Sequence, residues 1–154
     1  MASEKRIMLM ASMPVAVIMQ RRIVEHRWAS SVSWSVAGVV ACPPELSGVQ
    51  ALQWSDNQES FLHPGLQLEL HRDEDDGYFE NWAAPQPRIF VMWQMKEERA
   101  VPVTVSVSYG EGTRMLDSGD CADGVAMPPD IHAWLTAYLQ AHYQPKPRGR
   151  RGHG

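Results

Sequence analysis

The segment LELHRDEDDGYFENW, residues 68–82, holds the densest group of side chains in the chain that could do chemistry. Four consecutive acids, residues 73–76, follow His71 and Arg72 and end at Gly77. Carboxylate oxygens are the ligands that calcium and magnesium prefer, and a histidine can transfer a proton near neutral pH. The segment is therefore a candidate for a cation loop or a catalytic site.

A calcium loop of the EF-hand type is excluded by the spacing of these residues. Such a loop has glycine at its sixth position and a bidentate glutamate at its twelfth. With Gly77 at position six, the first ligand would be Arg72 and the last would be Ala83, and neither side chain can bind calcium. A magnesium site with two carboxylates stays open, but it would need a phosphate partner, and no phosphate-binding motif occurs.

The alternative interpretation of residues 68–82 is structural. After the end of a strand, Asp73 is expected to cap a short helix over residues 73–82, with acids favoured in its first turn. Tyr78 and Trp82 lie four residues apart and would anchor one face of that helix. We therefore expect a structural role here, and we expect no catalytic residue, metal site or cofactor in the chain.

No other motif with catalytic or metal-binding spacing occurs. The chain has no GxxxxGK[ST] phosphate loop, no GxSxG, no HExxH and no cysteine or histidine pair at zinc spacing. His63 and His71 form no recognisable ligand set with Cys42. Because Cys42 and Cys121 are far apart and neither is part of a CxxC, we expect no disulfide framework and a cytoplasmic location.

Length and charge predict one domain with a basic tail. The 154 residues suffice for a single core; we expect a flexible N-terminus (1–12), one domain (13–143) and a disordered tail (144–154). Subtracting the tail's four positive charges from the net charge of −4 leaves −8, which argues against nucleic-acid binding by the folded domain. No apolar run is long enough to span a bilayer. Most of the six tryptophans are expected to be core or rim anchors, and Trp28 and Trp34 to be core anchors.

Alternation of apolar and polar residues predicts a mostly antiparallel sheet of about six or seven strands. The clearest case is residues 101–109, where Val103, Val105 and Val107 alternate with polar residues. Proline and glycine at positions 64–65 are interpreted as a turn between two strands. The expected strands are residues 13–19, 31–40, 49–55, 60–63, 66–71, 88–96 and 101–109.

A C-terminal amphipathic helix is the one helix that periodicity predicts clearly. It begins at the prolines of positions 128–129, with Asp130 in its first turn. Residues 110–124, before it, contain several glycines and are expected to form a loop. The apolar residues of the C-terminal helix fall on one face of it: Ile131, Trp134, Leu135, Tyr138 and Leu139. A helix packed on an antiparallel sheet gives an α+β fold.

Several segments of the chain together resemble a known family. They are PVAVIMQRR, the two tryptophans before SVAGV, LELHRDEDDGYFENW, and MLDSG followed by VAMPPDIHAWLTAYLQAHYQPKPRGRRG. In combination they resemble the bacterial domain of unknown function DUF3305, from about Pro14 to the basic tail. The chain departs from the family's usual pattern at Trp82, where a leucine is usual, and at Gly77, which inside a helix costs about 1 kcal/mol.

The resemblance implies a cytoplasmic protein encoded beside formate dehydrogenase and its maturation factors. Some members carry the label molybdopterin-guanine dinucleotide biosynthesis protein. A nucleotidyltransferase of that kind should begin with a glycine-rich strand–loop motif on an alternating βαβ pattern, whereas this chain begins its first strand with MPVAVIMQRR and is predicted to be antiparallel. The genomic association is therefore the better guide to function.

From this resemblance we expect a non-enzymatic accessory protein that contacts a subunit or maturation factor of a molybdenum- or tungsten-dependent formate dehydrogenase. Two alternatives stay open: an enzyme or carrier for the pterin cofactor or its guanine nucleotide, and a stand-alone structural or regulatory domain. The residues expected to bind the partner are Arg21, Arg22, His71, Arg72, Tyr78 and Asn81.

Overall fold

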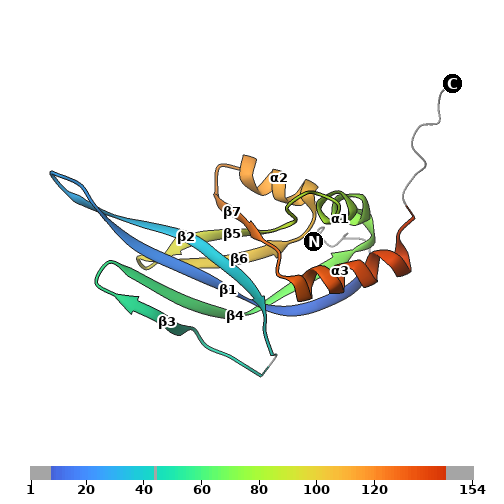
Figure 1. The fold of residues 1–154 in the computed structure, drawn as a ribbon, viewed down its shortest axis with the longest axis horizontal. Helices are drawn as coiled ribbons and strands as arrows, with labels where there is room; N and C mark the ends of the chain where they lie inside the picture. The colour runs from blue at the N-terminus through green and yellow to red at the C-terminus, as the bar shows by residue number, and fades with distance from the viewer. Residues whose placement is uncertain (1–7, 44, 145–154) are drawn as a thin grey trace.

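Two antiparallel sheets and three α-helices make up residues 8–43 and 45–144, which are the residues that this computed structural model describes (Figure 1). The predicted α+β class is confirmed, but the strands form two sheets and not one. Apart from Gln144, the basic tail expected at 144–154 lies outside the described residues, as do residues 1–7.

The larger sheet has the strand order β2-β1-β4-β3. Its strands are β1 (Leu9–Glu25), β2 (Ser30–Ala41), β3 (Gln50–Ser55) and β4 (Gln58–His71). β1 is longer than the predicted strand at both ends, and it begins inside the segment expected to be a flexible terminus. It continues through Arg21 and Arg22 because both residues pair with β2 on one side and with β4 on the other.

β4 runs through the Pro64-Gly65 pair, so the turn predicted there is wrong. The ladder between β1 and β4 shifts register at this point, and Pro64 and Gly65 lie opposite Ala16 alone. A bulge of this kind tolerates a proline, which has no N–H to donate, and favours a glycine with positive φ. Gly65 has a φ of +96°. The two predicted strands are therefore one bulged strand.

The smaller sheet has the order β6-β5-β7. Its strands are β5 (Arg88–Lys96), β6 (Arg99–Ser106) and β7 (Cys121–Ala126). The predicted β5–β6 hairpin is confirmed, and its two-residue turn has positive φ at both Glu97 and Glu98, which matches the twist of the strands. β7 was expected to be loop; it is short and pairs with β5 on the side opposite β6.

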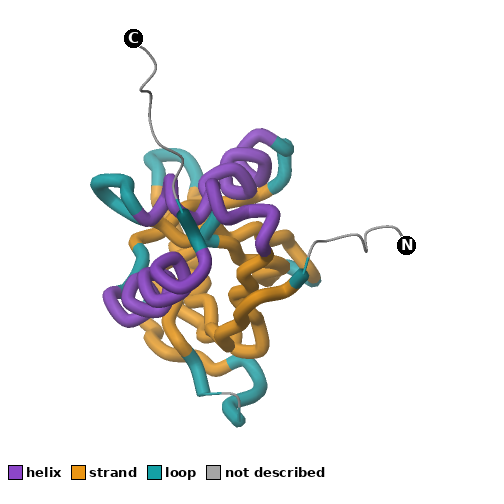
Figure 2. The backbone as a smooth tube through the Cα atoms, turned by 90° about the vertical axis from the view of Figure 1, so that its right-hand side faces the viewer, coloured by secondary structure: helices purple, strands orange, loops and turns teal. Residues whose placement is uncertain are grey.

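The helices gather at one end of the sheets, and the other end consists of strands (Figure 1). Figure 2 shows the molecule from the helical end, with the helices around the strands. The helices are the 3₁₀ turn η2 (Arg72–Glu74), α1 (Asp75–Trp82), α2 (Tyr109–Asp117) and α3 (Pro129–His142). The predicted C-terminal helix is confirmed by the burial of Ile131, Leu135, Tyr138 and Leu139. The capping role predicted for Asp73 is wrong, because Asp73 lies within η2 and Glu74 directly precedes α1. No described helix has the length and apolar character to cross a membrane.

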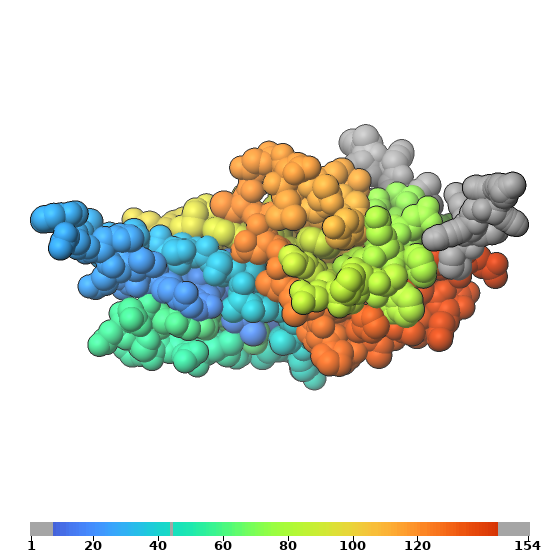
Figure 3. Space-filling model, turned by 45° about the horizontal axis from the view of Figure 1, so that its top comes forward, coloured from blue at the N-terminus to red at the C-terminus, as the bar shows by residue number. Residues whose placement is uncertain are grey.

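The core is shared by both sheets and by α1 and α3. Its fully buried large side chains are Val15, Val17, Met19, Val39, Leu68, Leu70, Tyr78, Ile89, Val91, Val107, Ile131 and Leu135. Away from the helices, the β1–β2 hairpin projects beyond the smaller sheet (Figures 1 and 3). We call residues 20–35, at this end of the hairpin, the arm.

The bulge in β4 generates a prediction about Gly65. A side chain added there has open space around it, so the cost of Gly65→Ala comes from the positive φ alone. We expect Gly65→Ala to lower the free energy of unfolding by about 1–2 kcal/mol in urea titrations. Gly38→Ala is the matched control, because Gly38 has equal space and no positive φ. Equal stability of the two variants would contradict the bulge geometry.

Candidate functional site

The acids of residues 75–76 join α1 to α3. The Tyr138 hydroxyl donates a hydrogen bond of 2.6 Å to Asp75 Oδ1, and the Tyr143 hydroxyl donates one of 2.7 Å to Asp76 Oδ1. Burial, and then the bond to Asp75, raises the pKa of Tyr138 above its ordinary value. The bond to Asp76, with a smaller contribution from burial, raises the pKa of Tyr143 to about 12. These carboxylates act as hydrogen-bond acceptors in the contact between α1 and α3.

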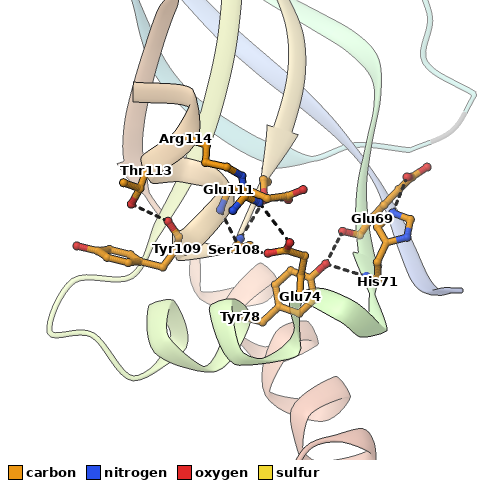
Figure 4. Close-up of polar contacts among 10 residues, drawn as sticks. Glu69, His71, Glu74, Tyr78, Ser108, Tyr109, Glu111, Thr113 and Arg114 are labelled. Carbon is orange, nitrogen blue, oxygen red and sulfur yellow. Dashed lines mark hydrogen bonds and ion pairs between the residues drawn. The ribbon is translucent and has the colours of Figure 1, made fainter. Parts of the chain in front are cut away.

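Glu74 joins the start of α1 to the start of α2 (Figure 4). Its Oε1 accepts a hydrogen bond of 2.6 Å from the Ser108 hydroxyl, and its Oε2 lies 3.3 Å from a guanidinium nitrogen of Arg114. The Ser108 oxygen in turn accepts a bond of 3.2 Å from the backbone N–H of Glu111, which caps α2. One carboxylate therefore ties a helix cap and a helix side chain to the neighbouring helix.

A second serine completes the cap of α2. Ser106 Oγ accepts a bond of 3.0 Å from the Ser108 N–H and donates one of 2.6 Å to Glu111 Oε1. In a capping box the glutamate at the third helical position bonds the N-cap N–H directly; here Ser106 relays that bond. The signal S-x-x-E at Ser108-Tyr109-Gly110-Glu111 would have predicted α2, but the glycines in this segment favoured a loop.

Two glycines are required because elements approach closely beside these caps. A Cβ atom at Gly77 would collide with Ser108 Oγ, and one at Gly112 would collide with the ring of Phe90. The glycine that departs from the family's usual pattern in α1 therefore has a packing reason. It lets α1 approach the N-terminus of α2.

Tyr78 and Asn81, two of the predicted partner-binding residues, are buried. The Tyr78 hydroxyl accepts a 2.7 Å bond from the His71 N–H and donates a longer one, 3.5 Å, to the Glu69 carbonyl. Asn81 Nδ2 donates to the carbonyls of Arg88 (2.8 Å) and Val107 (2.9 Å), and Asn81 Oδ1 accepts from the Arg88 N–H (3.0 Å). Both side chains hold α1 on the sheets, and neither is exposed on the surface of the described chain.

The four remaining predicted residues lie at opposite ends of β1 and do not form one surface. His71 pairs with Leu9 at the start of β1, and Arg21 lies twelve residues further along the strand, which corresponds to roughly 40 Å. Arg72 is exposed and its N–H bonds the carbonyl of Met8, so it stays near His71. Partner binding by either pair stays a prediction, but one continuous site cannot contain both.

A polar cleft of about 300 Å³ lies beside His71 and Arg114. His71 Nε2 is 3.1 Å from Glu69 Oε1, and the Arg114 side chain is largely exposed. The cleft is lined by Gln67, Glu69, His71, Met92, Thr104, Val105, Glu111, Arg114 and Met115. The described residues contain no group of three or more histidine, cysteine or acidic side chains that could hold a metal ion. The cleft can offer carboxylate acceptors and a guanidinium to a polar ligand.

The arm, together with β3 and the start of β4, carries a second, more apolar candidate surface. Trp34, Arg21, Glu59 and Trp54 pair in turn across β2, β1, β4 and β3, so their side chains lie in a row on one face of the sheet. An ion pair of 3.3 Å joins Arg21 and Glu59 in the middle of the row. Trp54 is 78% exposed, and Trp28 at the tip of the arm is 88% exposed, so the burial predicted for Trp28 is wrong.

A groove of about 510 Å³, which we call the arm groove, lies where the arm faces the smaller sheet. It is lined by Arg21, Val32, Trp34, Trp93, Met95, Glu98 and Cys121. Asp123 on β7 joins the two sheets beside it: Asp123 Oδ2 accepts hydrogen bonds from the Val36 N–H (2.9 Å) and from Trp93 Nε1 (3.2 Å). No local pattern predicts this groove, because its residues come from two different sheets and from the turn between β5 and β6.

Comparison with known proteins supports the resemblance seen in the sequence. A family model described as a protein of unknown function, DUF3305, matches residues 14–152. The matched segment includes the three helices, the arm and both sheets, apart from the first five residues of β1. No curated protein and no solved structure matches the chain.

The contact at Gly77 generates a prediction about stability. We expect Gly77→Ala to lower the free energy of unfolding by about 1–3 kcal/mol, because the added methyl group displaces Ser108 and overpacks the contact between α1 and α2. Gly110→Ala is the control, since its added Cβ meets only ordinary van der Waals contacts and alanine favours a helix by about 1 kcal/mol. A Gly77→Ala variant as stable as the wild type would show that the helices are further apart.

The bond between Tyr143 and Asp76 generates a prediction about pH. The folded-state pKa of Tyr143, about 12, exceeds the ordinary value of 10.0, so the stabilisation is complete below pH 10 and is lost as the pH rises towards 12. We expect the stability difference between wild type and Tyr143→Phe to shrink over that range. Asp76→Asn should move the Tyr143 titration, followed by NMR, back towards 10. A titration unchanged in Asp76→Asn would contradict the assigned cause.

Proposed function

The chain belongs to the DUF3305 family, and we propose that it is a non-enzymatic accessory protein that acts by protein–protein contact. The proposed partner is a subunit or a maturation factor of a molybdenum- or tungsten-dependent formate dehydrogenase, in the cytoplasm. The choice of partner rests on the genomic association that the family resemblance implies. The proposal that the chain acts by protein–protein contact rests on the exposed surface of the chain itself.

The observation that carries the proposal is the exposed aromatic surface formed by the arm and by β3 of the same sheet. Trp28 and Trp54 are 88% and 78% exposed, and Val32 and Leu52 are about half exposed on the same β-sheet. Large exposed aromatic side chains are costly in water and are the residue type most enriched at the centres of protein interfaces. A partner that covers the arm would bury this apolar area.

The chemistry of the helical end supports a structural role for its acids. Asp75, Asp76 and Glu74 each accept a short hydrogen bond from a tyrosine or serine hydroxyl on a neighbouring element. Carboxylates held in this way stabilise the junction between helices. The acidic run is therefore part of the scaffold that supports the arm in this proposal.

A second candidate is a carrier or enzyme for the pterin cofactor or its guanine nucleotide, and the polar cleft favours it. A guanine base has two adjacent N–H groups, and a carboxylate such as that of Glu69 can accept hydrogen bonds from both. The exposed guanidinium of Arg114 can pair with a phosphate. Calorimetric binding of a guanine nucleotide that is lost in His71→Ala and Arg114→Ala, and kept in Trp28→Ser, would favour this function. The third possibility, a stand-alone structural or regulatory domain, predicts no effect on the dehydrogenase.

The accessory function is tested in cells that lack the gene for this chain. We expect formate dehydrogenase activity to fall on deletion, and a dehydrogenase subunit or maturation factor to co-purify with the tagged wild-type chain. Trp28→Ser with Trp54→Ser should reduce both recovery and complementation, because the variant removes the exposed aromatic area.

Leu116→Ser is the matched control, since Leu116 is a half-exposed apolar residue on α2, outside the arm. Unchanged dehydrogenase activity in the deletion strain, together with no recovered partner, would overturn the accessory function.

A further inference from the structure

The outer edge of β2 is open along the arm. β2 is the terminal strand of the sheet, so only one of its edges pairs with β1. The Val36 N–H donates to Asp123, which shows that the backbone of Val36 faces away from β1. In an antiparallel ladder the direction alternates from residue to residue, and the register is continuous from Val36 to Ser30. The backbone groups of Val32 and Trp34 therefore also face outwards.

No described residue bonds these outward groups of Val32 and Trp34. Asp123 covers the edge only at Val36, where β7 lies beside it. Natural proteins usually protect an edge strand with charged residues, with prolines or with a covering element. β2 has twelve residues, SSVSWSVAGVVA, and contains neither a charge nor a proline. Its first half is therefore a ready template for another strand.

The arm groove lies beside this edge and supplies side-chain pockets. Val32 and Trp34 line it from β2, and Trp93 and Met95 line it from β5. A strand added along β2 would direct alternate side chains to the face that carries Trp34. Those side chains would enter the groove. An extended segment of about six residues, roughly 20 Å, matches the open half of β2.

Charge distinguishes the kind of segment that fits. The arm carries three arginines, Arg21, Arg22 and Arg27, and one acid, Glu25. Arg21 is paired with Glu59, whereas Arg22 and Arg27 are exposed. The arm is thus basic in a chain of net charge −4. A segment with acidic residues beside its apolar stretch is complementary to it.

We propose that the open edge of β2 binds an extended, acid-flanked segment of a partner protein as an added antiparallel or parallel strand, with the apolar side chains of the segment in the arm groove. This is recognition by strand addition, in which backbone hydrogen bonds provide affinity and alternate pockets provide specificity. This inference rests on the proposed function and adds to it the way in which the partner binds.

The probe is a set of fluorescein-labelled nine-residue peptides in which valine or leucine alternates with threonine, flanked by aspartates in one series and by lysines in the other. We expect the full chain to bind the aspartate series more tightly by fluorescence polarisation. In hydrogen-exchange NMR, the bound peptide should protect the amides of Val32 and Trp34. The amides of Ser33 and Ser35, which face β1, should change little.

The matched variants are Val32→Pro and Val32→Thr. Proline removes one outward N–H and is tolerated on a strand edge, whereas threonine keeps both the N–H and the branched shape. We expect roughly tenfold weaker binding for Val32→Pro, which corresponds to about 1.4 kcal/mol, and little change for Val32→Thr. Urea unfolding of both variants checks that they are folded. A second variant does not alter Val32. In Arg22→Glu with Arg27→Glu, the protein should bind the lysine series of peptides more tightly than the aspartate series.

Three results would overturn the strand-addition mode. They are the absence of binding by any peptide, equal binding by the proline and threonine variants, and a dimer of this chain, seen by sedimentation, in which the amides of Val32 and Trp34 are already protected. If one of these is found while deletion of the gene still lowers dehydrogenase activity, the accessory function stands and only the mode of binding fails. If deletion has no effect while the peptides bind as expected, the accessory function fails alone.

Discussion

The buried amide of Asn81 is the interaction on which the arrangement of the other elements depends. It accepts a hydrogen bond from the N–H of Arg88 and donates hydrogen bonds to the carbonyls of Arg88 and Val107. This one side chain therefore satisfies backbone groups at the start of β5 and just after the end of β6, as a neighbouring strand would. Buried backbone groups need such partners. Because Asn81 is on α1, the position of α1 determines where the smaller sheet begins, and the caps and hydroxyl contacts of Glu74 and Tyr78 then hold α1 against α2 and β4.

The molecule that results has two unlike ends. At the helical end the acids are engaged by tyrosine and serine hydroxyls, and the side chains of Tyr78 and Asn81 are buried. At the other end, strands of the larger sheet extend past the smaller sheet (Figures 1 and 3). Aromatic side chains and a strand edge remain uncovered there. The helical end is held by many side-chain hydrogen bonds, and this division is the reason why the proposal places partner contact at the exposed end.

Local signals were reliable where a residue's role depends on its immediate neighbours. The acids at 75–76 were expected in the first turn of a helix and are there, and the apolar face of α3 is buried as its spacing predicts. The same signals failed where a distant element decides the role of a residue. Pro64-Gly65 forms a bulge because β1 pairs with β4 on both sides of it. Position 112 in α2 requires a glycine because the ring of Phe90 occupies the space of a side chain, so this glycine does not indicate a loop.

The sequence by itself determined the α+β class, the C-terminal helix, the positions of most strands, the exclusion of an EF-hand loop and the family resemblance. These depend on periodicity and on residue types within a short window. Only the tertiary structure decided that the strands form two sheets, that Tyr78 and Asn81 are buried, and that Arg21 and His71 lie at opposite ends of one long strand. Such features depend on which strands pair, in what register, and where one sheet ends against the other, and no local pattern in the chain encodes those choices.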